Sequence, residues 1–458
     1  MKESGQALPS ARPRFKPYPA CKASGVEWLG EVPAHWEVKR VKTIAAVQLS
    51  NVDKKSVEGQ ESVRLCNYVD VYYNDHIGPD LDFMAATATP EQVRRFSLRA
   101  GDVLITKDSE SWTDIAVPAI VTSDLPDVLC GYHLALVRPA FDCDGAFLAR
   151  AFSAIGPRDQ FQVAANGITR FGLGGDAIRT GLFASPPVHE QRAIAAFLDR
   201  ETARIDALVA KKERLIELLQ EKRTALITRA VTKGLDPNAP MKDSGVEWLG
   251  EIPRHWKVLP LTKYLVEKSD YRGKTPEKTT DGVLLVTARN VRMGFIDYEC
   301  SQEFVAEGDY REIMRRGLPR KGDILFTTEA PLGNVALVDR EDVALAQRII
   351  RFRVKSNVLD SQFALLGMMS LPFQAQLASF STGSTAEGLK ASKLPQLRLV
   401  APPVGEQYII IEQVHRVMTN ADALLAKIRS AIDRLKELRT ALISAAVTGK
   451  IDVREEVA

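Results

Sequence analysis

The sequence predicts an α+β protein built as an internal repeat, in which two equivalent frames hold two different mixed α/β inserts and end in two long helices. Three recurring blocks predict this arrangement, and the first of them is rich in tryptophan. The blocks are Ser24-Gly-Val-Glu-Trp-Leu-Gly-Glu-Val-Pro-Ala-His-Trp36 with Ser244-Gly-Val-Glu-Trp-Leu-Gly-Glu-Ile-Pro-Arg-His-Trp256, Pro186-Pro-Val-His-Glu-Gln191 with Pro402-Pro-Val-Gly-Glu-Gln407, and Arg223-Thr-Ala-Leu-Ile227 with Arg439-Thr-Ala-Leu-Ile443. Between the blocks the halves hardly resemble each other, which suits one task performed twice on two different targets.

The first 23 residues are polar and rich in proline, without the apolar stretch of a signal peptide. We expect residues 1–23 to form a disordered arm. The first insert domain is predicted over 24–188 and the second over 244–404, with a proline-containing linker at 234–243 between the repeats. Both inserts contain a Gly-Asp turn that leads into an apolar strand, at Gly101-Asp-Val-Leu-Ile-Thr106 and Gly322-Asp-Ile-Leu-Phe-Thr327.

Two long helices are predicted at 189–233 and 405–450, because apolar residues recur there at steps of three and four without an interrupting glycine or proline. About 40 residues in each give a rod of about 60 Å. An apolar stripe of that length needs a partner, and the other helix is the obvious one; ordinary core helices are the alternative. The stripes are Ile194, Leu198, Ile205, Leu208, Leu215, Leu219 and Leu226, and Ala421, Leu424, Ile428, Ala431, Leu435, Leu438 and Leu442.

The composition is that of a globular protein, with 45% hydrophobic and 26% charged residues. The apolar runs are too short for a bilayer span, so no membrane segment is expected. Five cysteines without a CxxC pair favour a reduced, cytoplasmic protein without a zinc site. The net charge of +3 identifies no partner, but residues 24–188 are acidic by about six charges and 244–404 basic by about three. The acidic half counts mildly against a nucleic-acid ligand.

Several short strings imitate catalytic motifs and fail on chemistry. The two Pro-Pro-Val strings lack the aromatic residue that stacks a flipped base in adenine methyltransferases. Gly273-Lys-Thr275 lacks the upstream glycine of a phosphate-binding loop. His35 and His255 have no cysteine or second histidine at metal-ligand spacing, and we expect them to hydrogen-bond locally. The sequence thus predicts neither catalysis nor a cofactor nor a metal.

What remains is surface chemistry suited to base edges, because guanidinium groups match guanine and carboxamides match adenine in the major groove. An ordinary solvated loop is the alternative for each candidate. In the second insert the candidate DNA contacts are Arg272, Lys274, Thr275, Arg289, Asn290, Arg292, Ser384 and Thr385. In the first insert they are Lys107, Ser109, Trp112, Asn166, Thr169 and Arg170.

The whole set of duplicated blocks, within residues 24–450, resembles the specificity (S) subunit of Type I restriction–modification enzymes. This resemblance implies two target recognition domains separated by two long antiparallel helices that form a coiled coil. Each domain would read half of a split sequence in double-stranded DNA, and the helices would set the spacer. The implied partners are modification (methyltransferase) subunits, two of them, and restriction (translocase/endonuclease) subunits, which would carry out the catalysis in phage defence.

Three other functions compete with this interpretation. A methyltransferase or nuclease in its own right needs a complete cofactor loop or metal cluster, and a fused relative with recognition and catalysis in one chain needs more length. A coiled-coil scaffold without DNA binding gives the inserts no reason to diverge. For the tryptophan motifs, we expect a structural clamp on a helix end, with a docking surface for the modification subunit as the alternative.

Overall fold

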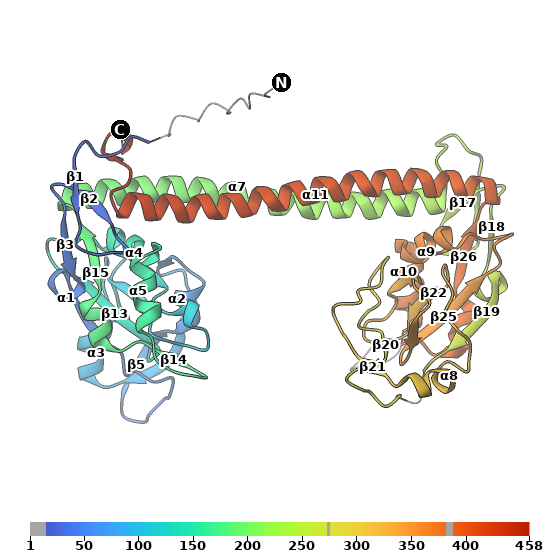
Figure 1. Ribbon diagram of the computed structural model, residues 1–458, viewed down its shortest axis with the longest axis horizontal. Coiled ribbons are helices and arrows are strands. Elements are labelled where there is room, and N and C mark those ends of the chain that lie inside the picture. Colours follow the sequence, from blue (N-terminus) through green and yellow to red (C-terminus); the bar gives the residue numbers. More distant parts are fainter. Residues whose placement is uncertain (1–14, 273–274, 382–387, 458) are drawn as a thin grey trace, which may run out of the picture. The chain divides into compact units, whose positions relative to one another are not determined.

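The computed structural model describes residues 15–272, 275–381 and 388–457. The chain divides into two compact units, one of residues 1–212 with 430–458 and one of residues 213–429. The boundaries cut both long helices, so each unit contains an insert domain and half of each helix (Figure 1). Within the described residues, no single helix is long and apolar enough to cross a membrane; helices α9 and α10, bent by 65°, pass that test only as a pair.

The two largest sheets of the first unit have the strand orders β4-β13-β9-β11-β6 and β7-β5-β12-β8; β1-β2, β10-β14 and β15-β3 form two-stranded sheets. Two parallel pairings, β11 with β6 and β12 with β5, interrupt an otherwise antiparallel arrangement. Its elements before the long helix are β1 Cys21–Ala23, β2 Glu31–Pro33, β3 Glu37–Arg40, α1 Val41–Ile44, β4 Ala45–Leu49, β5 Glu61–Cys66, α2 Tyr68–Tyr72, β6 His76–Ile77, β7 Met84–Ala88, α3 Pro90–Phe96, β8 Ser97–Leu98, β9 Val103–Thr106, β10 Asp108–Ser109, η1 Trp112–Asp114, β11 Pro118–Val121, β12 Leu125–Cys130, β13 Leu134–Pro139, α4 Gly145–Ser153, α5 Pro157–Ala164, β14 Phe171–Gly172, α6 Gly175–Thr180 and β15 Leu182–Ser185.

The second unit repeats this plan in shorter form, with sheets β19-β25-β22-β23 and β21-β20-β24. Strand β20 pairs with β24 in parallel, as β5 does with β12 in the first unit. Its elements are β16 Met241–Asp243, β17 Glu251–Pro253, β18 Lys257–Pro260, η2 Leu261–Tyr264, β19 Leu265–Asp270, β20 Val283–Val286, β21 Phe304–Val305, η3 Glu307–Asp309, α8 Tyr310–Ile313, β22 Ile324–Thr327, β23 Val335–Leu337, β24 Val343–Leu345, β25 Ile349–Val354, α9 Ser361–Met369, α10 Leu371–Phe380, η4 Ala391–Gln396 and β26 Arg398–Ala401. The predicted fold class, with its internal repeat, is confirmed.

The Gly-Asp turns have the same structural role in both units. Asp102 accepts a hydrogen bond from the backbone N–H of Arg99 (2.8 Å) and two from the guanidinium of Arg138 (2.7 Å each). In the second unit Asp323 does the same with the backbone of Arg320 (2.9 Å) and with Arg353 (2.8 Å). A buried carboxylate needs such partners, so this pair fixes the start of the central strand in each sheet.

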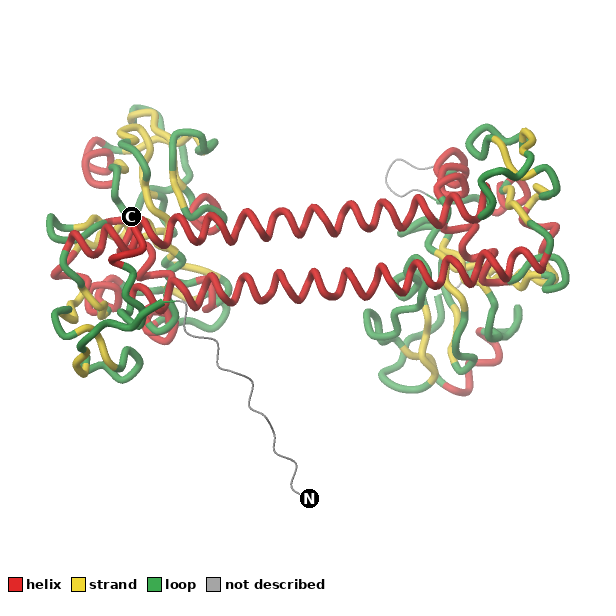
Figure 2. The backbone as a smooth tube through the Cα atoms, turned by 90° about the horizontal axis from the view of Figure 1, so that it is seen from above, coloured by secondary structure: helices red, strands yellow, loops and turns green. Residues whose placement is uncertain are grey.

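The long helices are α7 Val188–Lys233 and α11 Val404–Val447, both continuous in Figure 2. In the first unit Arg439 of α11 donates to Asp206 of α7 (3.1 Å), and in the second unit Arg223 of α7 donates to Asp422 of α11 (3.0 Å). The residue numbers of each ion pair add to 645, so the same antiparallel register holds within each unit. The recurring arginines of the sequence therefore align the helices.

The apolar stripes were predicted one residue out of place at several positions. Leu208 and Leu215 are 41% and 43% exposed. The neighbouring Val209 and Ile216 are instead partly buried. Two adjacent apolar residues fit a spacing of three or four equally well, so the pattern alone could not choose between them. The other stripe residues that are exposed are Leu226, Leu424 and Leu438.

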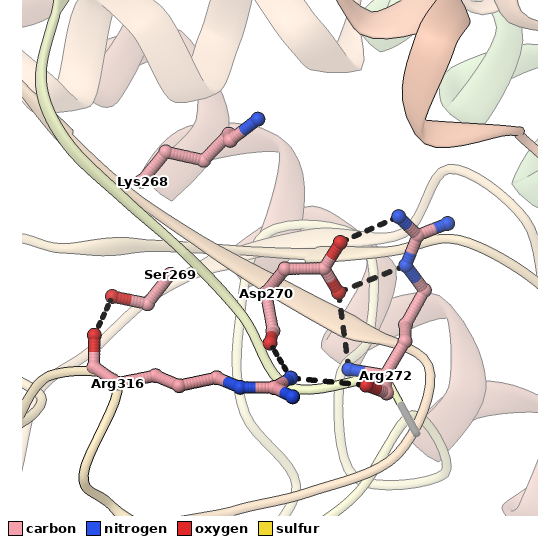
Figure 3. A pocket seen from close by; sticks show the side chains of 5 residues that line it. All are labelled: Lys268, Ser269, Asp270, Arg272 and Arg316. Atoms are coloured by element: carbon pink, nitrogen blue, oxygen red, sulfur yellow. Dashed lines mark hydrogen bonds and ion pairs between the residues drawn. The ribbon is translucent and has the colours of Figure 1, made fainter.

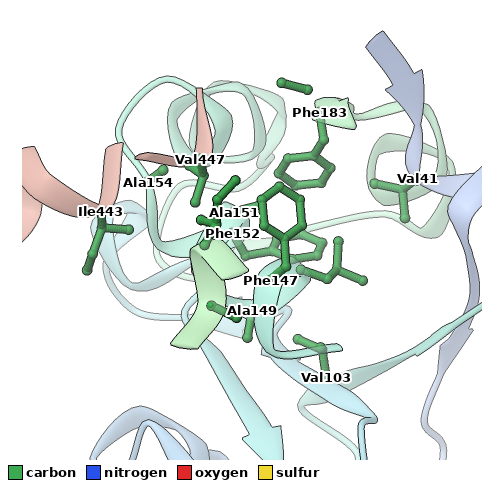
Figure 4. Close-up of a cluster of buried hydrophobic side chains, with 14 of the residues drawn as sticks. Val41, Val103, Phe147, Ala149, Ala151, Phe152, Ala154, Phe183, Ile443 and Val447 are labelled. Carbon is green, nitrogen blue, oxygen red and sulfur yellow. The ribbon is translucent and has the colours of Figure 1, made fainter. Parts of the chain in front are cut away.

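The end of α11 contributes to the core of the first unit. Ile443 and Val447 of α11 belong to the same buried cluster as Phe147, Phe152 and Phe183 (Figure 4). The rings of Phe152 and Phe183 lie with centroids 4.9 Å apart at an edge-to-face angle of 66°. The C-terminal helix is therefore part of the first domain's core as well as a partner of α7.

The tryptophan motifs end at buried side chains. Trp36 and Trp256 are fully buried, whereas Trp28 is 39% exposed. Trp256 donates its indole N–H to Glu406 at the start of α11 (3.1 Å). Gly234, after α7, has φ of 73° and lies against the same indole ring. The second motif is thus clamped between the ends of both long helices.

From the sequence we expected the histidines of the motifs to hydrogen-bond locally, but both bond to residues far away along the chain. His35 contacts Glu190 and His255 contacts Glu406, in both cases with 2.8 Å between Nε2 and a carboxylate oxygen. These partners lie 155 and 151 residues away along the chain. The prediction was wrong because each carboxylate belongs to the Pro-Pro-x-x-Glu-Gln block, which folds back onto the motif.

Replacing Trp256 by alanine should lower the stability of the second unit by about 3–5 kcal/mol, since a large buried ring and its hydrogen bond are lost. Chemical denaturation of the full chain measures this loss. Trp28→Ala is the matched control and should cost much less, because that ring is partly exposed. A Trp256→Ala chain as stable as the parent contradicts the clamp.

Asp75 supplies a pH-dependent contact, because it pairs with Arg439 of α11 (2.6 Å) and with Arg150 of α4 (3.3 Å). Burial acts to raise the pKa of Asp75, but the two arginines hold it below its ordinary value. Because folding lowers the pKa of Asp75, its ion pairs stabilise the folded chain fully at pH values above the unfolded-state pKa of about 3.9. This stabilisation is lost as the pH falls through the folded-state pKa. We expect Asp75→Asn to cost up to about 1 kcal/mol at pH 7, and this cost should disappear as the pH falls through the lowered pKa of Asp75.

The measurement is denaturation of both proteins across a pH series, with Asp176→Asn as the control for a carboxylate that is 98% exposed. A constant difference between parent and Asp75→Asn at every pH would mean that the carboxylate's charge is not the source of the effect.

Candidate nucleic-acid interface

Two candidate loops of the first insert lie together in the structure. Strand β10 pairs with β14, with Ser109 opposite Phe171. The backbone of Asn166 forms a bridge with Gly172, and Leu173 donates its N–H to the carbonyl of Lys107 (2.7 Å). The loop after β9 and the loop before β14, which the sequence suggested separately, therefore form one surface.

Lys107 does not point freely into solvent. It is buried, its ammonium group lies 2.6 Å from Asp108, and it sits 4.7 Å from the ring centroid of Tyr132. Asp108 also contacts the Nδ1 atom of His133 (3.2 Å). Burial acts to raise the pKa of Asp108, but the hydrogen bonds with Lys107 and His133 hold it below its ordinary value. The charge of Lys107 is thus already matched within the domain.

Arg170 extends this cluster towards the surface. Its Nη2 atom is 3.1 Å from both ring nitrogens of His133, which places the guanidinium over the ring rather than at one nitrogen. Thr169 and Asn166 are exposed on the same loop, and Trp112 and Tyr132 are about half exposed. The hydroxyl of Ser109 bonds to Tyr68 (3.2 Å). This surface therefore offers aromatic faces, hydroxyl groups and a stacked arginine more than free charge.

In the second insert, Arg272 is held by internal contacts. Its guanidinium donates to both carboxylate oxygens of Asp270 (2.9 and 2.5 Å) and to the carbonyl of Leu389 (3.1 Å) (Figure 3). The hydrogen bonds with Asp270 raise the pKa of Arg272. Beside it, Thr275 is exposed and its hydroxyl accepts a hydrogen bond from Gln347.

The run Arg289-Asn-Val-Arg292 divides into outward and inward residues. Arg289 is exposed, and no described residue pairs with its guanidinium. Arg292 is 47% exposed, with Asp297 at 3.7 Å. Asn290 is fully buried, and its amide donates to the carbonyls of Asp297 (3.0 Å) and Ser301 (2.9 Å).

The oxygen of the Asn290 amide accepts from the backbone of Thr287 (3.0 Å), three residues earlier. Asp70 makes the matching contact with Asn67 in the first unit (2.6 Å). In this conformation the amide oxygen and nitrogen of Asn290 are already hydrogen-bonded within the domain, so they cannot contact a base edge. This corrects the assignment of Asn290 as a DNA contact. Its side chain stabilises a turn, as that of Asp70 does. A single sequence could not distinguish a turn-capping amide from a reading amide.

Lys274, Ser384 and Thr385 lie outside the described residues. The sequence analysis also missed several residues that the structure places at these surfaces. Asp108, His133 and Tyr132 complete the first cluster, and Lys268 and Arg316 line a pocket beside Arg272. None of them belongs to a recurring block. Within residues 15–272, 275–381 and 388–457, no three His, Cys, Asp or Glu side chains are grouped to hold a metal ion.

Comparison with known proteins relates the sequence to one family. Residues 306–434 match the family model described as the Type I restriction modification DNA specificity domain. The chain is 26% identical over 275 residues to the Type I restriction enzyme MjaVIII specificity subunit of Methanocaldococcus jannaschii, and 24% identical over 288 residues to the EcoBI specificity subunit of Escherichia coli. These alignments cover 59% and 61% of this chain, and 62% and 60% of the relatives' own length. A third relative, the putative MjaX specificity subunit of M. jannaschii, is 20% identical over 93% of this chain and 96% of its own.

The fold has solved counterparts. A chain from a structure of the type I R-M system, described for its complex assembly and conformational transition, superposes with a TM-score of 0.69 at 14% identity, covering 92% of this chain and 99% of its own. The HsdS subunit from Thermoanaerobacter tengcongensis superposes with a TM-score of 0.51 at 14% identity, over 92% and 98% of the two chains. The predicted resemblance is confirmed: the chain is similar in sequence to the specificity subunits of Type I restriction–modification enzymes and has the fold of their solved counterparts.

Proposed function

We propose that this chain is the DNA sequence-recognition subunit of a Type I restriction–modification complex. Each insert domain reads one half of a bipartite site in double-stranded DNA. The observation that carries this proposal is one repeated frame, with the histidine–glutamate and glutamine–backbone contacts present in both copies, around two inserts whose exposed chemistry differs. A repeated frame with different inserts provides two readers of different sequences.

The long helices set the spacer between the half-sites and dock the other subunits. Their register supports this role, since Arg439–Asp206 and Arg223–Asp422 fix the same alignment in each unit. A pair of helices locked by matched ion pairs and an apolar seam is stiff enough to act as a ruler. Exposed leucines on both helices, such as Leu215 and Leu424, are available to partner subunits.

Catalysis belongs to the partners in this proposal. The chain supplies no catalytic group or cofactor site of its own, because the strings that imitate catalytic motifs lack essential residues. Two modification subunits fit a chain with two equivalent frames, and restriction subunits complete the complex. A partner that acts on cellular DNA places the complex in the cytoplasm.

We expect the chain co-expressed with its modification subunits to shift duplex DNA that contains the bipartite site, and to discriminate against duplexes with either half-site altered. The electrophoretic shift should be much weaker for the chain alone. If the assembled complex binds all duplexes alike, or if the chain alone methylates or cleaves DNA, the proposed function is wrong.

Arg289 and Asn290 give a matched pair of adjacent variants. Arg289→Ala should leave stability unchanged, weaken binding of the complex by about 1–3 kcal/mol and relax one position of one half-site. Asn290→Ala should instead lower the stability of the second unit by about 1–3 kcal/mol, because buried donors and acceptors lose their partner. Denaturation of the chain and binding to all single-base variants of the site separate the two effects. Parental affinity and specificity for Arg289→Ala would remove Arg289 from the interface.

A further inference from the structure

An open pocket of about 740 Å³ lies beside the edge strand β19 of the second unit, lined by Lys268, Ser269, Asp270, Arg272 and Arg316 (Figure 3). We call it the Lys268 pocket. Lys268 and Asp270 alternate along the strand and Arg272 follows at the same spacing, so a strand periodicity presents all three on one side. Arg316 comes from the loop after α8.

The pocket holds more positive than negative charge. Asp270 matches the guanidinium of Arg272 (2.5 Å). Arg316 donates to the backbone carbonyls of Asp270 and Arg272, which leaves its charge uncompensated. Lys268 is exposed, and no described residue pairs with its ammonium group. Among the lining residues, three cations and one carboxylate therefore leave two positive charges for a ligand. Glu329, whose charge also acts on Arg272, pairs with Arg348 (3.5 Å).

The nearby carboxylate of Glu267 does not cancel this excess. It points to the other side of β19, where it pairs with Arg351 and Arg353, and Asp323 completes that network with ion pairs of 2.6 and 2.8 Å. The two positive charges of these arginines equal the two negative charges of Glu267 and Asp323. The Lys268 pocket therefore keeps its charge even though a buried ionic cluster lies directly behind it.

Backbone contacts hold the pocket walls in place. Ser269 donates its hydroxyl to the carbonyl of Arg316 (2.7 Å), and the hydroxyl of Tyr271 bonds to the carbonyl of Gly317. Arg272 reaches the carbonyl of Leu389 (3.1 Å). Cationic groups whose positions are fixed before binding lose little conformational freedom when an anion arrives.

The described part of the first unit carries different side chains at this place. Strand β4 pairs with β13 as β19 pairs with β25, and this register puts Val47 and Leu49 at the positions of Lys268 and Asp270. Apolar side chains there provide no donor. The charged lining at this position therefore distinguishes the second domain and accounts for part of its basic character.

We propose that the Lys268 pocket holds a backbone phosphate of duplex DNA and so positions the second domain on its half-site. This inference rests on the proposed function. The ammonium group of Lys268 and the guanidinium of Arg316 are donors of the kind that proteins place on phosphates, and such contacts fix position without reading sequence. The open shape suits a polymer that passes across the surface, whereas a free phosphate or nucleotide would need a more enclosed site.

The first test is binding of the assembled complex to duplex DNA across a salt series. Lys268→Ala should weaken binding to cognate and non-cognate duplexes by the same factor and lower the slope of log affinity against log salt by about one. Lys257→Ala, which removes an exposed lysine from β18 outside the pocket, is the matched control and should leave the slope unchanged. A parental slope for Lys268→Ala, or a loss confined to one base pair of the site, overturns the assignment.

The second test distinguishes DNA from a small anion. Acylation of lysines in the assembled complex, read by mass spectrometry, reports access to the ammonium group of Lys268 without any variant. Duplex DNA should protect Lys268 but not Lys257, and inorganic phosphate at the same concentration of phosphate groups should protect neither. Equal protection by inorganic phosphate means a small-anion site and overturns the proposal.

The two proposals fail in different ways. If the complex binds DNA without sequence preference but Lys268→Ala still lowers the salt slope, the pocket assignment is supported and the proposed recognition function is wrong. If the complex discriminates between half-sites but Lys268→Ala has the parental salt slope, only the pocket assignment is wrong.

Discussion

Each frame depends on one pair of adjacent side chains at the start of its long helix, a glutamate followed by a glutamine. Glu190 is almost fully buried and accepts hydrogen bonds from Tyr18 (2.6 Å) and His35 (2.8 Å). Gln191 accepts the backbone N–H of Asp144 (2.7 Å) and donates to the carbonyls at 142 and 186. A buried carboxylate and a buried amide left without these partners would each be costly. The same two side chains thus tie the tryptophan motif, the insert's last helices and α7 together.

Glu406 and Gln407 do this in the second repeat, where Gln407 bonds to the backbone at 358, 360 and 402. None of these contacts uses the central part of an insert, so the inserts can differ without loosening the frame.

One ion pair occurs at the same place in both inserts, but the residues around it differ between them. Asp102–Arg138 and Asp323–Arg353 occupy the same place in the two sheets. The strand register puts Leu136 of the first sheet where the second has Arg351, which is fully buried and adds Glu267 to the network. A buried arginine requires carboxylates around it, and these in turn shape what the outer side of β19 can carry. The first domain lacks that requirement and keeps an apolar strand there. The same scaffold therefore supports two different surfaces.

The elements marked by local chemistry could be predicted from the sequence, and those set by distant partners could not. Proline pairs before each long helix gave starts within one residue of Val188 and Val404, because proline favours the first helical turn and restricts the residue before it. The seam was misassigned at Leu208 and Leu215 because each adjoins a second apolar residue, and the choice depends on the ion pairs between the helices. The partners of His35 and His255 lie more than 150 residues away. Arg289 was recognised as outward facing, but Asn290 was misjudged because burial is invisible in a pattern of residue types. Lys268 went unnoticed since no motif surrounds it.

The acidic balance of residues 24–188 does not describe the surface that this domain presents around its paired loops. Net charge counts every ionised residue, whereas a ligand responds to the charges that remain uncompensated at the surface. Ion pairs inside the first domain, such as Asp102 with Arg138, Asp108 with Lys107, and Asp127 with Arg64, remove one charge of each sign; they leave the net charge unchanged but neutralise those places on the surface. Asp75 is matched in part by Arg439, which lies outside the counted range. What faces outward around the paired loops is aromatic and hydroxyl-rich, with Arg170 stacked over an imidazole. In the second domain the balance runs the other way, because Lys268 and Arg316 remain unmatched. The two halves thus differ in the chemistry with which they can hold the same class of ligand, and the sign of their total charge does not describe that difference.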